Sequence, residues 1–277
     1  MRTPSLALIL LAACNGGLID TVVDSGSSTE PTDPGTTTDT GSDTGSDTAT
    51  QPPPCDVPGC ERCLDAGFWA ISEQQSTPDG LRAALRQAMT GFNSCDYATT
   101  TKYMFLTLDN VNHEVECIYT GRKTTVTTQK PDPNTDMNTE HTWPQSEGAD
   151  SIPAKCDLHH LRPSDSEANG KRANYPFGLV VGTPTWSAGG SRLGDNSAGD
   201  VVFEPRPERR GDIARGMLYF ALEYNFQLSS SELSMYRSWS HADPVDDAEY
   251  KRTMDIRAWQ HHANPFVACP DMVDRAW

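Results

Sequence analysis

Apolar side chains recur at helical spacing in two stretches of this chain. Residues 79–92 carry the first stripe, and Pro78 suits the first helical position. Residues 211–224 carry a second stripe, and a third helix is predicted from the Asp243-Pro244 cap toward Trp259, ended by Pro265-Phe266. The two stripes consist of Leu81, Ala84, Leu85, Ala88, Met89 and Phe92, and of Ile213, Met217, Phe220, Ala221 and Tyr224.

A β-rich pattern appears between the first two helices. Residues 115–120 and 123–127 are two such runs around Gly121-Arg122, which predicts a hairpin. Ser164 to Glu167 fits a capping box, so a very short helix is expected to begin at Pro163 or Ser164 and to stop at Gly170. Together these patterns predict an α+β fold, with a mainly helical body around a small two-stranded centre.

The first 14 residues read as an export signal rather than as part of the fold. Met1-Arg2 precedes the apolar run Leu6 to Leu11, which is too short to span a membrane stably. Leu11 to Cys14 also has the pattern of a bacterial lipobox, in which the cysteine receives a lipid. We therefore predict a lipid anchor at Cys14, and the alternative is an ordinary secretory signal cut near the same place.

Residues 15–54 consist mainly of Gly, Ser, Thr, Asp and Pro and cannot build a core. They predict a disordered acidic tether with an r.m.s. reach of roughly 35 Å. This leaves residues 55–277 as the globular domain. With Arg2 removed from 22 basic residues, and seven tether acids removed from 38, the domain carries 21 − 31 = −10 formal charges. Such a balance counts against tight nonspecific binding of nucleic acid.

Seven cysteines remain once Cys14 is set aside. In an exported protein this odd number favours up to three disulfides and one free thiol, whose pairing one sequence does not reveal. Cys55, Cys60 and Cys63 are the alternative start of a zinc knuckle, although no second Cys-x-x-Cys pair follows them.

The residues best suited to chemistry are Glu140, His141 and Asn169. A neutral imidazole at His141 is able to take a proton from water while its other nitrogen is held by a carbonyl or a carboxylate. Glu140 and Asn169 offer hard oxygen ligands, and two protein ligands leave room for water and a phosphate oxygen, which suits Mg²⁺, with Ca²⁺ or Mn²⁺ as alternatives. We therefore predict a hydrolytic site with one divalent metal.

Further candidates lie close to this set. Asp157 and His160 are predicted to support the site or to contact a phosphate, and with His159 they form the alternative of a zinc site. Arg162 and Arg172 each suit a phosphate or a departing oxygen, because a guanidinium binds phosphate through paired donors. Either arginine is equally well explained as an ion-pair partner on the surface.

Residues 138–146, 157–163 and 169–178 resemble the bacterial endonuclease I family. Further similarity at residues 203–206, 211–215 and 264–267 extends the resemblance over most of residues 79–270. The resemblance implies a ββα-metal, or His-Me finger, core and magnesium-dependent cleavage of DNA, and often RNA, with little sequence preference. It makes His141 the general base, and Glu140 and Asn169 the metal ligands.

This chain departs from the family pattern at two places. Some members carry an arginine on an insertion that steadies the cleaved phosphate, whereas residues 147–156 are short here and offer Lys155 alone, so Arg172 is our candidate for that role. Residues 260–263 replace a more basic stretch, which puts DNA contacts there in doubt.

We therefore expect an exported endonuclease, lipid-anchored in the cell envelope or otherwise periplasmic or secreted, with nucleic acid as substrate and no protein partner. Two alternatives stay open. One is a surface lipoprotein that acts as a non-catalytic binding module, which the negative charge suits. The other is a zinc hydrolase with a different substrate.

Overall fold

The structure is a computed structural model that describes residues 65–128 and 136–277. In these ranges the chain combines helices with small antiparallel sheets, which confirms the predicted α+β class. The predicted signal, lipid anchor, tether and zinc knuckle fall outside the described residues. Within the described ranges, no helix has both the length and the apolar character needed to cross a bilayer.

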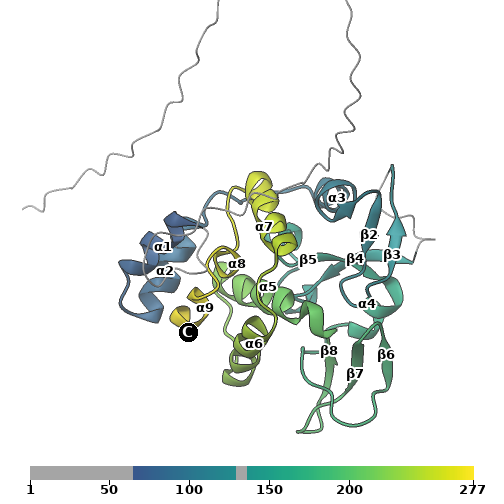
Figure 1. Cartoon of the computed structure of the whole chain (residues 1–277). Helices are drawn as coiled ribbons and strands as arrows, with labels where there is room; N and C mark the ends of the chain where they lie inside the picture. Colours follow the sequence, from purple (N-terminus) through teal and green to yellow (C-terminus); the bar gives the residue numbers. More distant parts are fainter. Residues whose placement is uncertain (1–64, 129–135) are drawn as a thin grey trace, which may run out of the picture. The chain divides into compact units, whose positions relative to one another are not determined.

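Most of the helices gather on one side of the described domain, and the sheets lie on the other with α3 and α4 (Figure 1). The helices are α1 (Ala66–Glu73), α2 (Pro78–Ala88), α3 (Tyr97–Tyr103), which continues into the π-helical turn η1 (Met104–Leu108), α4 (Ser166–Arg172), α5 (Arg210–Glu223), α6 (Ser230–Ala242), α7 (Asp247–Gln260), α8 (Pro265–Ala268) and α9 (Met272–Ala276). Short 3-10 turns include η3 (Gln145–Glu147) and η4 (Ala154–Cys156).

The strands form three small antiparallel sheets. The first has β1 (Asn110–Val111), β2 (Glu114–Glu116) and β3 (Lys123–Thr125) in that order, the second pairs β4 (Met137–His141) with β5 (Leu161–Asp165), and the third has β6 (Trp186–Ala188), β7 (Ser191–Asp195) and β8 (Val201–Glu204). The second sheet is followed directly by α4, so that two strands and one helix form a compact unit.

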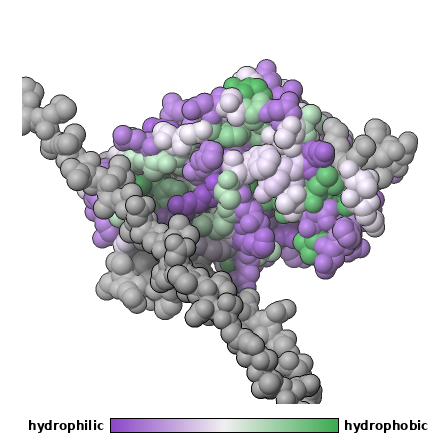
Figure 2. Space-filling view, turned by 90° about the horizontal axis from the view of Figure 1, so that it is seen from above, coloured by the Kyte–Doolittle hydropathy of each residue, from purple (hydrophilic) through white to green (hydrophobic). Residues whose placement is uncertain are grey.

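Helix α5 is the central element of the core. Every residue from Gly211 to Leu222 is buried, as expected for a helix that other elements surround on all sides. A Cβ atom on Gly211 would lie 2.0 Å from the carbonyl oxygen of Asp243, so glycine allows α5 to approach the loop before α7. The face seen in Figure 2 is mostly hydrophilic, and its hydrophobic residues form separate small groups.

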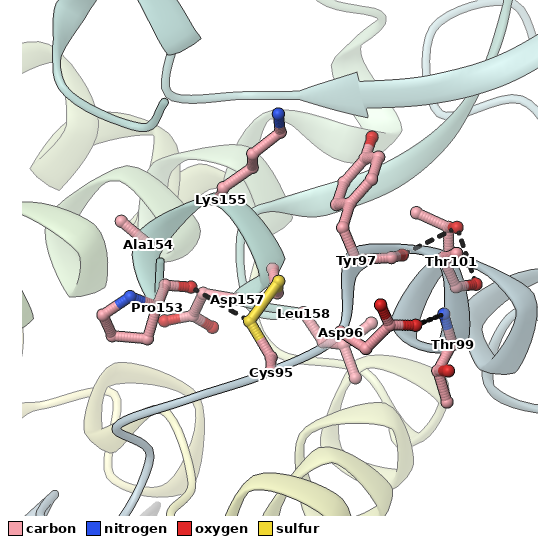
Figure 3. Close-up of a disulfide and its surroundings, with 12 residues drawn as sticks. Cys95, Asp96, Tyr97, Thr99, Thr101, Pro153, Ala154, Lys155, Asp157 and Leu158 are labelled. Carbon is pink, nitrogen blue, oxygen red and sulfur yellow. Dashed lines mark hydrogen bonds between the residues drawn. A yellow bond between two sulfur atoms is a disulfide. The ribbon is translucent and has the colours of Figure 1, made fainter. Parts of the chain in front are cut away.

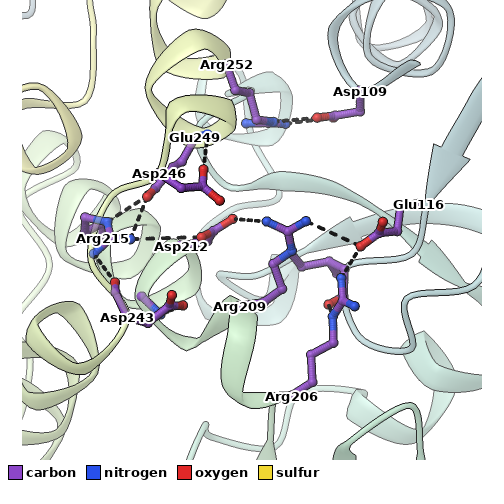
Figure 4. A network of polar contacts seen from close by, with 12 residues as sticks. Asp109, Glu116, Arg206, Arg209, Asp212, Arg215, Asp243, Asp246, Glu249 and Arg252 are labelled. Carbon is purple, nitrogen blue, oxygen red and sulfur yellow. Dashed lines mark hydrogen bonds and ion pairs between the residues drawn. The ribbon is translucent and has the colours of Figure 1, made fainter. Parts of the chain in front are cut away.

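Buried charges tie α5 to its neighbours (Figure 4). The guanidinium of Arg215 is fully buried and donates through Nε to Glu249 at 2.8 Å and through Nη1 to the Asp243 carbonyl at 2.8 Å. Arg252 donates to Asp109 and to the Leu161 carbonyl, which fastens α7 to β5. Ion pairs removed from water in this way need such additional hydrogen bonds to offset the cost of desolvation.

The predicted elements are largely present, with shifted boundaries. Helices α2 and α5 confirm both apolar stripes, and α7 (Asp247–Gln260) is the third predicted helix. The predicted hairpin pairs β2 with β3, but its turn spans residues 117–122, closed by a hydrogen bond from the Cys117 amide to the Arg122 carbonyl at 2.8 Å. The hairpin belongs to the three-stranded sheet β1–β2–β3, so it is not the two-stranded centre that was predicted. The two-stranded sheet is instead formed by β4 and β5.

The boundaries of two helices were predicted incorrectly. Pro163 and Ser164 belong to β5, where they pair with β4, so α4 begins only at Ser166 and runs through Gly170. The third helix has Asp246, not Asp243, as its N-cap, because the Asp246 side chain accepts the Glu249 amide at 2.7 Å. That helix ends at a left-handed His261, and Pro265 begins α8 instead of ending α7.

Candidate active site

The candidate site is built on the β4–β5 hairpin and α4. Glu140 and His141 are the last two residues of β4, where they pair with Arg162 and Leu161 of β5. The chain then enters α4, whose packing against both strands brings Asn169 back toward β4. The three residues predicted to carry the chemistry are thus supplied by one local unit.

His141 is held from three sides. Its Nε2 donates to the carbonyl of Lys155 at 3.2 Å, and its ring stacks on Tyr97 with centroids 5.7 Å apart. The side-chain amide of Gln145 lies 3.4 Å from Nδ1. Burial, with a smaller contribution from nearby His160, lowers the pKa of His141 to about 3. The imidazole is therefore neutral at physiological pH, and Nδ1 is its proton acceptor.

The carboxylate of Glu140 is almost completely buried, with 2% of the residue exposed. Oε1 accepts from the hydroxyl of Tyr119 at 2.8 Å and lies 3.4 Å from Nε of Arg172. Burial raises the pKa of Glu140 to about 7, although Arg172 and Tyr119 both act to lower it. The site thus holds a carboxylate whose negative charge its protein neighbours compensate only in part.

Asn169 is fixed by its amide nitrogen. Nδ2 donates to Oδ1 of Asn138 at 2.7 Å and to the carbonyl of Thr139 at 3.2 Å. Its own Oδ1 accepts no hydrogen bond from any residue that the structure describes. Asn169 lies within α4 and not at its end, so the helix-capping explanation for this residue does not apply.

Arg172 is buried beneath Glu140, with 1% of the residue exposed. Its Nη2 donates to the carbonyl of Thr142 at 2.6 Å, its Nη1 donates to that of Ala173 at 2.9 Å, and its guanidinium lies 4.5 Å from the centre of the Phe177 ring. These contacts exclude a surface ion pair as the explanation for Arg172. They favour a role in holding Glu140 over direct contact with a phosphate.

The other candidate residues divide into two groups. His160 is at the site, because its ring meets that of His141 edge-on at 5.4 Å, and its Nε2 donates to the Ala154 carbonyl at 2.8 Å. Asp157 is fully buried and accepts from the hydroxyls of Tyr219 and Tyr224 at 2.8 and 2.9 Å. This carboxylate therefore supports the core beside the site.

Arg162 is turned toward a different part of the molecule. It lines a pocket of about 490 Å³ together with residues of β2, α5 and α7, and the carboxylates nearest to it include Asp212, Asp109 and Glu249. Burial lowers the pKa of Arg162 to about 10. With 8% of the residue exposed, Arg162 is not the surface ion-pair partner that the sequence left open.

The donor set of the site fits a hard divalent cation. The two oxygen donors are Oδ1 of Asn169 and the buried carboxylate of Glu140, whose Oε2 takes part in no side-chain hydrogen bond with a described residue. A cation beside Glu140 would offset the burial that raises the pKa of this carboxyl. For zinc the residues fit poorly, since the described ranges contain no group of three or more His, Cys, Asp or Glu placed to hold a metal.

A disulfide joins the two segments that contact His141 from outside the hairpin. Cys95 precedes α3 and bonds to Cys156, at the end of η4. Tyr97 and Lys155 project in the same direction from these two segments (Figure 3). The Nζ of Lys155 lies 5.3 Å from the centre of the Tyr97 ring, and its charge contributes to the lowered pKa of His141. Both segments that contact His141 are thus joined covalently.

The cysteine prediction is confirmed in one respect. Cys117 is a free, buried thiol in the described part of the chain, and Cys269 is disulfide-bonded in addition to the Cys95–Cys156 pair.

Sequence reasoning missed Tyr119 and Tyr97, which orient the two central side chains. Tyr119 was placed in a predicted strand, and Tyr97 lies 44 positions before His141. No local spacing connects either tyrosine with the motif. The sequence therefore offered no signal that identifies either tyrosine.

Comparison with known proteins identifies the family of this chain. The sequence model of the family described as Endonuclease I matches residues 82–271. The chain is 29% identical over 235 residues to the extracellular ribonuclease of Bacillus subtilis (strain 168), covering 77% of this chain and 79% of that protein. It is 33% identical over 166 residues to the extracellular ribonuclease of Bacillus amyloliquefaciens, covering 51% and 54%.

A third relative is the extracellular deoxyribonuclease of Aeromonas hydrophila, 33% identical over 111 residues, which are 40% of this chain and 48% of that protein. The last two matches therefore span about half the length of each relative. The family match covers well over half of this chain and includes the whole β4–β5–α4 unit. The protein therefore belongs to the endonuclease I family and is a nuclease.

Proposed function

We propose that this nuclease is a metal-dependent endonuclease that hydrolyses phosphodiester bonds of DNA or RNA with little sequence preference. The β4–β5–α4 unit would act as the ββα-metal core that the sequence predicts. Relatives named as ribonucleases and as deoxyribonucleases support both substrates. Family membership also decides for an enzyme over the non-catalytic binding module.

The observation that carries the proposal is the hydrogen bond from Nε2 of His141 to the Lys155 carbonyl. It fixes the neutral tautomer whose Nδ1 is the acceptor, and it points that nitrogen away from the backbone. In this position Nδ1 takes a proton from the attacking water, and stacking on Tyr97 prevents the ring from turning. The side-chain amide of Gln145 donates to the same nitrogen at 3.4 Å, a long hydrogen bond that the attacking water would replace.

Glu140 and Asn169 are the residues that would hold the metal, which we expect to be Mg²⁺, with Ca²⁺ or Mn²⁺ as substitutes. When bound, the cation supplies positive charge for the phosphate oxygens and for the departing oxygen. Tyr119 and Arg172 fix Glu140 from behind, and Asn138 with the Thr139 carbonyl fixes Asn169. The ligands are thus positioned before the metal binds.

Lys155 is better placed than Arg172 to contact the phosphate. Arg172 is buried, whereas the Lys155 side chain is partly exposed beside Tyr97 and His141. We therefore assign the phosphate contact to Lys155 and a positioning role to Arg172. Lys155→Ala should then lower kcat more than Lys155→Arg does.

The test of the reaction is cleavage of supercoiled plasmid and of single-stranded RNA by the purified protein with Mg²⁺, Ca²⁺, Mn²⁺ or a chelator. We expect His141→Ala to lower kcat by about 10²- to 10⁴-fold. His241→Ala changes an exposed imidazole and serves as the matched control. Undiminished cleavage by His141→Ala would remove the proposed base, and no cleavage by the wild type with any of the three metals would refute the proposed reaction.

Export and anchoring form a separate part of the proposal. Relatives named as extracellular or periplasmic support export. We propose that Cys14 carries a lipid and that residues 15–54 tether the domain of residues 55–277 to a membrane. Cys14→Ser should release the exported protein from the membrane fraction. Unchanged partition of this variant would contradict the anchor and would leave the nuclease site unaffected.

A further inference from the structure

A pocket of about 330 Å³ opens where the N-terminal end of α3 meets the C-terminal end of α7. Its wall also includes the segment between α2 and α3. The lining residues that matter here are Phe92, Ser94, Asp96, Thr99, Trp259 and His261. None of these residues belongs to the site around His141.

Trp259 gives this pocket an aromatic wall. It is 40% exposed, the highest exposure among the six tryptophans, all of which lie in the described ranges. One face of the indole stacks on Tyr103, with centroids 4.0 Å apart and an interplanar angle of 8°. This stack fixes the orientation of the ring while leaving part of its surface open. An immobilised aromatic ring with an open face is the feature on which single-stranded nucleic acids stack their bases.

The remaining lining suits the edge of a base better than a phosphate. Ser94, Asp96, Thr99 and His261 offer hydroxyl, carboxylate and imidazole groups, and the described residues that line the pocket include no lysine or arginine. The Asp96 carboxylate is fixed because it accepts the Thr99 amide at 2.7 Å. A phosphate would meet this negative charge without a compensating cation, whereas the amino group of a base would find an acceptor.

One chain segment connects the pocket with His141. Asp96 and Thr99 line the pocket, and Tyr97 between them stacks on His141. Tyr97 and Thr99 point to opposite sides of this segment (Figure 3). Cys95, also in the wall, is bonded to Cys156, the neighbour of the residue whose carbonyl holds His141. The pocket and His141 therefore lie on opposite sides of one chain segment, so a strand that is cleaved at His141 could place a neighbouring base in the pocket.

We infer that this pocket binds an unpaired nucleobase of the substrate strand by stacking on Trp259, and that the enzyme consequently prefers single-stranded nucleic acid. The inference rests on the proposed function. A base in a duplex is stacked and paired, so it would have to leave the helix before it entered the pocket. Stacking also needs no neutralised phosphates, which suits a domain with a formal charge of 21 − 31 = −10.

Binding is the first test, because it does not depend on catalysis. The His141→Ala protein is titrated with a fluorescein-labelled single-stranded oligonucleotide in Mg²⁺, with anisotropy as the readout. Adding Trp259→Ala should raise Kd about tenfold, and adding Trp259→Phe should raise it much less. An oligonucleotide with abasic sites should bind weakly to all three proteins. Equal Kd values with and without the Trp259→Ala substitution, measured on the intact strand, would overturn the inference.

Kinetics on the otherwise unaltered enzyme give the second test. Trp259→Ala should raise KM for single strands about tenfold with little change in kcat, and should leave duplex cleavage unchanged. Equal losses on both substrates would contradict a base pocket. If loss of the Tyr103 stack unfolds the variant, Ser94→Trp fills the pocket with Trp259 in place, and Ser94→Ala is its control. Unchanged KM in Ser94→Trp would then overturn the inference.

These outcomes separate the two proposals. A wild-type protein that cleaves nothing contradicts the proposed reaction, but the oligonucleotide titration still reports on the pocket. If cleavage depends on His141 but single strands bind equally well without Trp259, the proposed reaction stands and the proposed base pocket is refuted.

Discussion

Two buried histidines should make this fold sensitive to mild acid. His159 is 3% exposed, with its ring against Tyr219 at 4.4 Å, and His160 is fully buried. Burial lowers the pKa of His159 to about 3 and that of His160 to about 4. Both imidazoles are neutral in the native protein, because burial disfavours the charged form.

The sign and the size of the effect follow from proton linkage. An unfolded histidine has a pKa of about 6.5, so on acidification the unfolded chain takes up protons before the native protein does. Stability that is present above pH 6.5 is therefore lost as the pH falls toward the native pKa values. Between pH 7.5 and pH 5.0 each histidine should cost about 2 kcal/mol, and the two together about 4 kcal/mol.

This loss is large beside the total stability of about 5–15 kcal/mol that is typical of a domain. Asp157 does not obscure it. Hydrogen bonds and the neighbouring histidines hold the pKa of Asp157 below its ordinary value despite burial, so its own contribution disappears only below about pH 5. Other groups contribute in the same interval, among them Glu140, whose raised pKa of about 7 acts in the opposite direction, so only the difference between the wild type and a histidine variant isolates one histidine.

The assay is urea unfolding, followed by tryptophan fluorescence at pH 7.5, 6.0 and 5.0. His160→Gln keeps an amide donor for the Ala154 carbonyl and removes one titrating group. The variant should lose about 2 kcal/mol less than the wild type over this interval, whatever its stability at pH 7.5. Equal pH dependence of the wild type and His160→Gln would refute the reasoning.

Three other changes have expected results. Replacing Cys95 and Cys156 by serine removes a link between residues 61 positions apart, which should cost about 4 kcal/mol in urea unfolding. It should also lower kcat, because both joined segments contact His141, the proposed base. Tyr119→Phe removes the buried 2.8 Å hydrogen bond to Glu140, so kcat with Mg²⁺ should fall several-fold, and Tm should drop by an amount equivalent to about 1–3 kcal/mol. Arg215→Met leaves the buried carboxylate of its α7 partner unpaired, and calorimetry should show a loss of about 3–5 kcal/mol with kcat of the remaining folded enzyme unchanged.

Helices with a continuous apolar stripe were predictable because the residues that a helix buries recur with the helical period along the sequence. That argument identified α2 and α5. It failed for the β4–β5 hairpin, since β4 reads Met-Asn-Thr-Glu-His and β5 contains Pro163, so neither strand shows an alternating apolar pattern. Polar side chains of the candidate site occupy the positions at which apolar residues would otherwise show the alternation of a strand.

The predicted start of α4 shows a second limit. Ser164 to Glu167 has the letters of a capping box, but pairing of Ser164 with Asn138 keeps the chain extended for two more residues. A local preference worth about 1 kcal/mol was outweighed by partners 26 positions away. A single sequence does not reveal which distant segment a strand pairs with. For the same reason it did not reveal that Tyr119, which lies in a turn, donates a hydrogen bond to Glu140.

Composition misled most where it was treated as a property of the whole domain. The acidic balance argued against tight nonspecific binding of nucleic acid, yet the proposed reaction needs cationic charge only at the phosphate, where Lys155 and a metal held by Glu140 and Asn169 would supply it. Charges elsewhere are engaged with one another, as Arg215 and Arg252 are with their carboxylates. A net charge counts these neutralised pairs together with the free ones. The relevant quantity for function is therefore the charge that faces the substrate, and the sequence alone does not separate it from the rest.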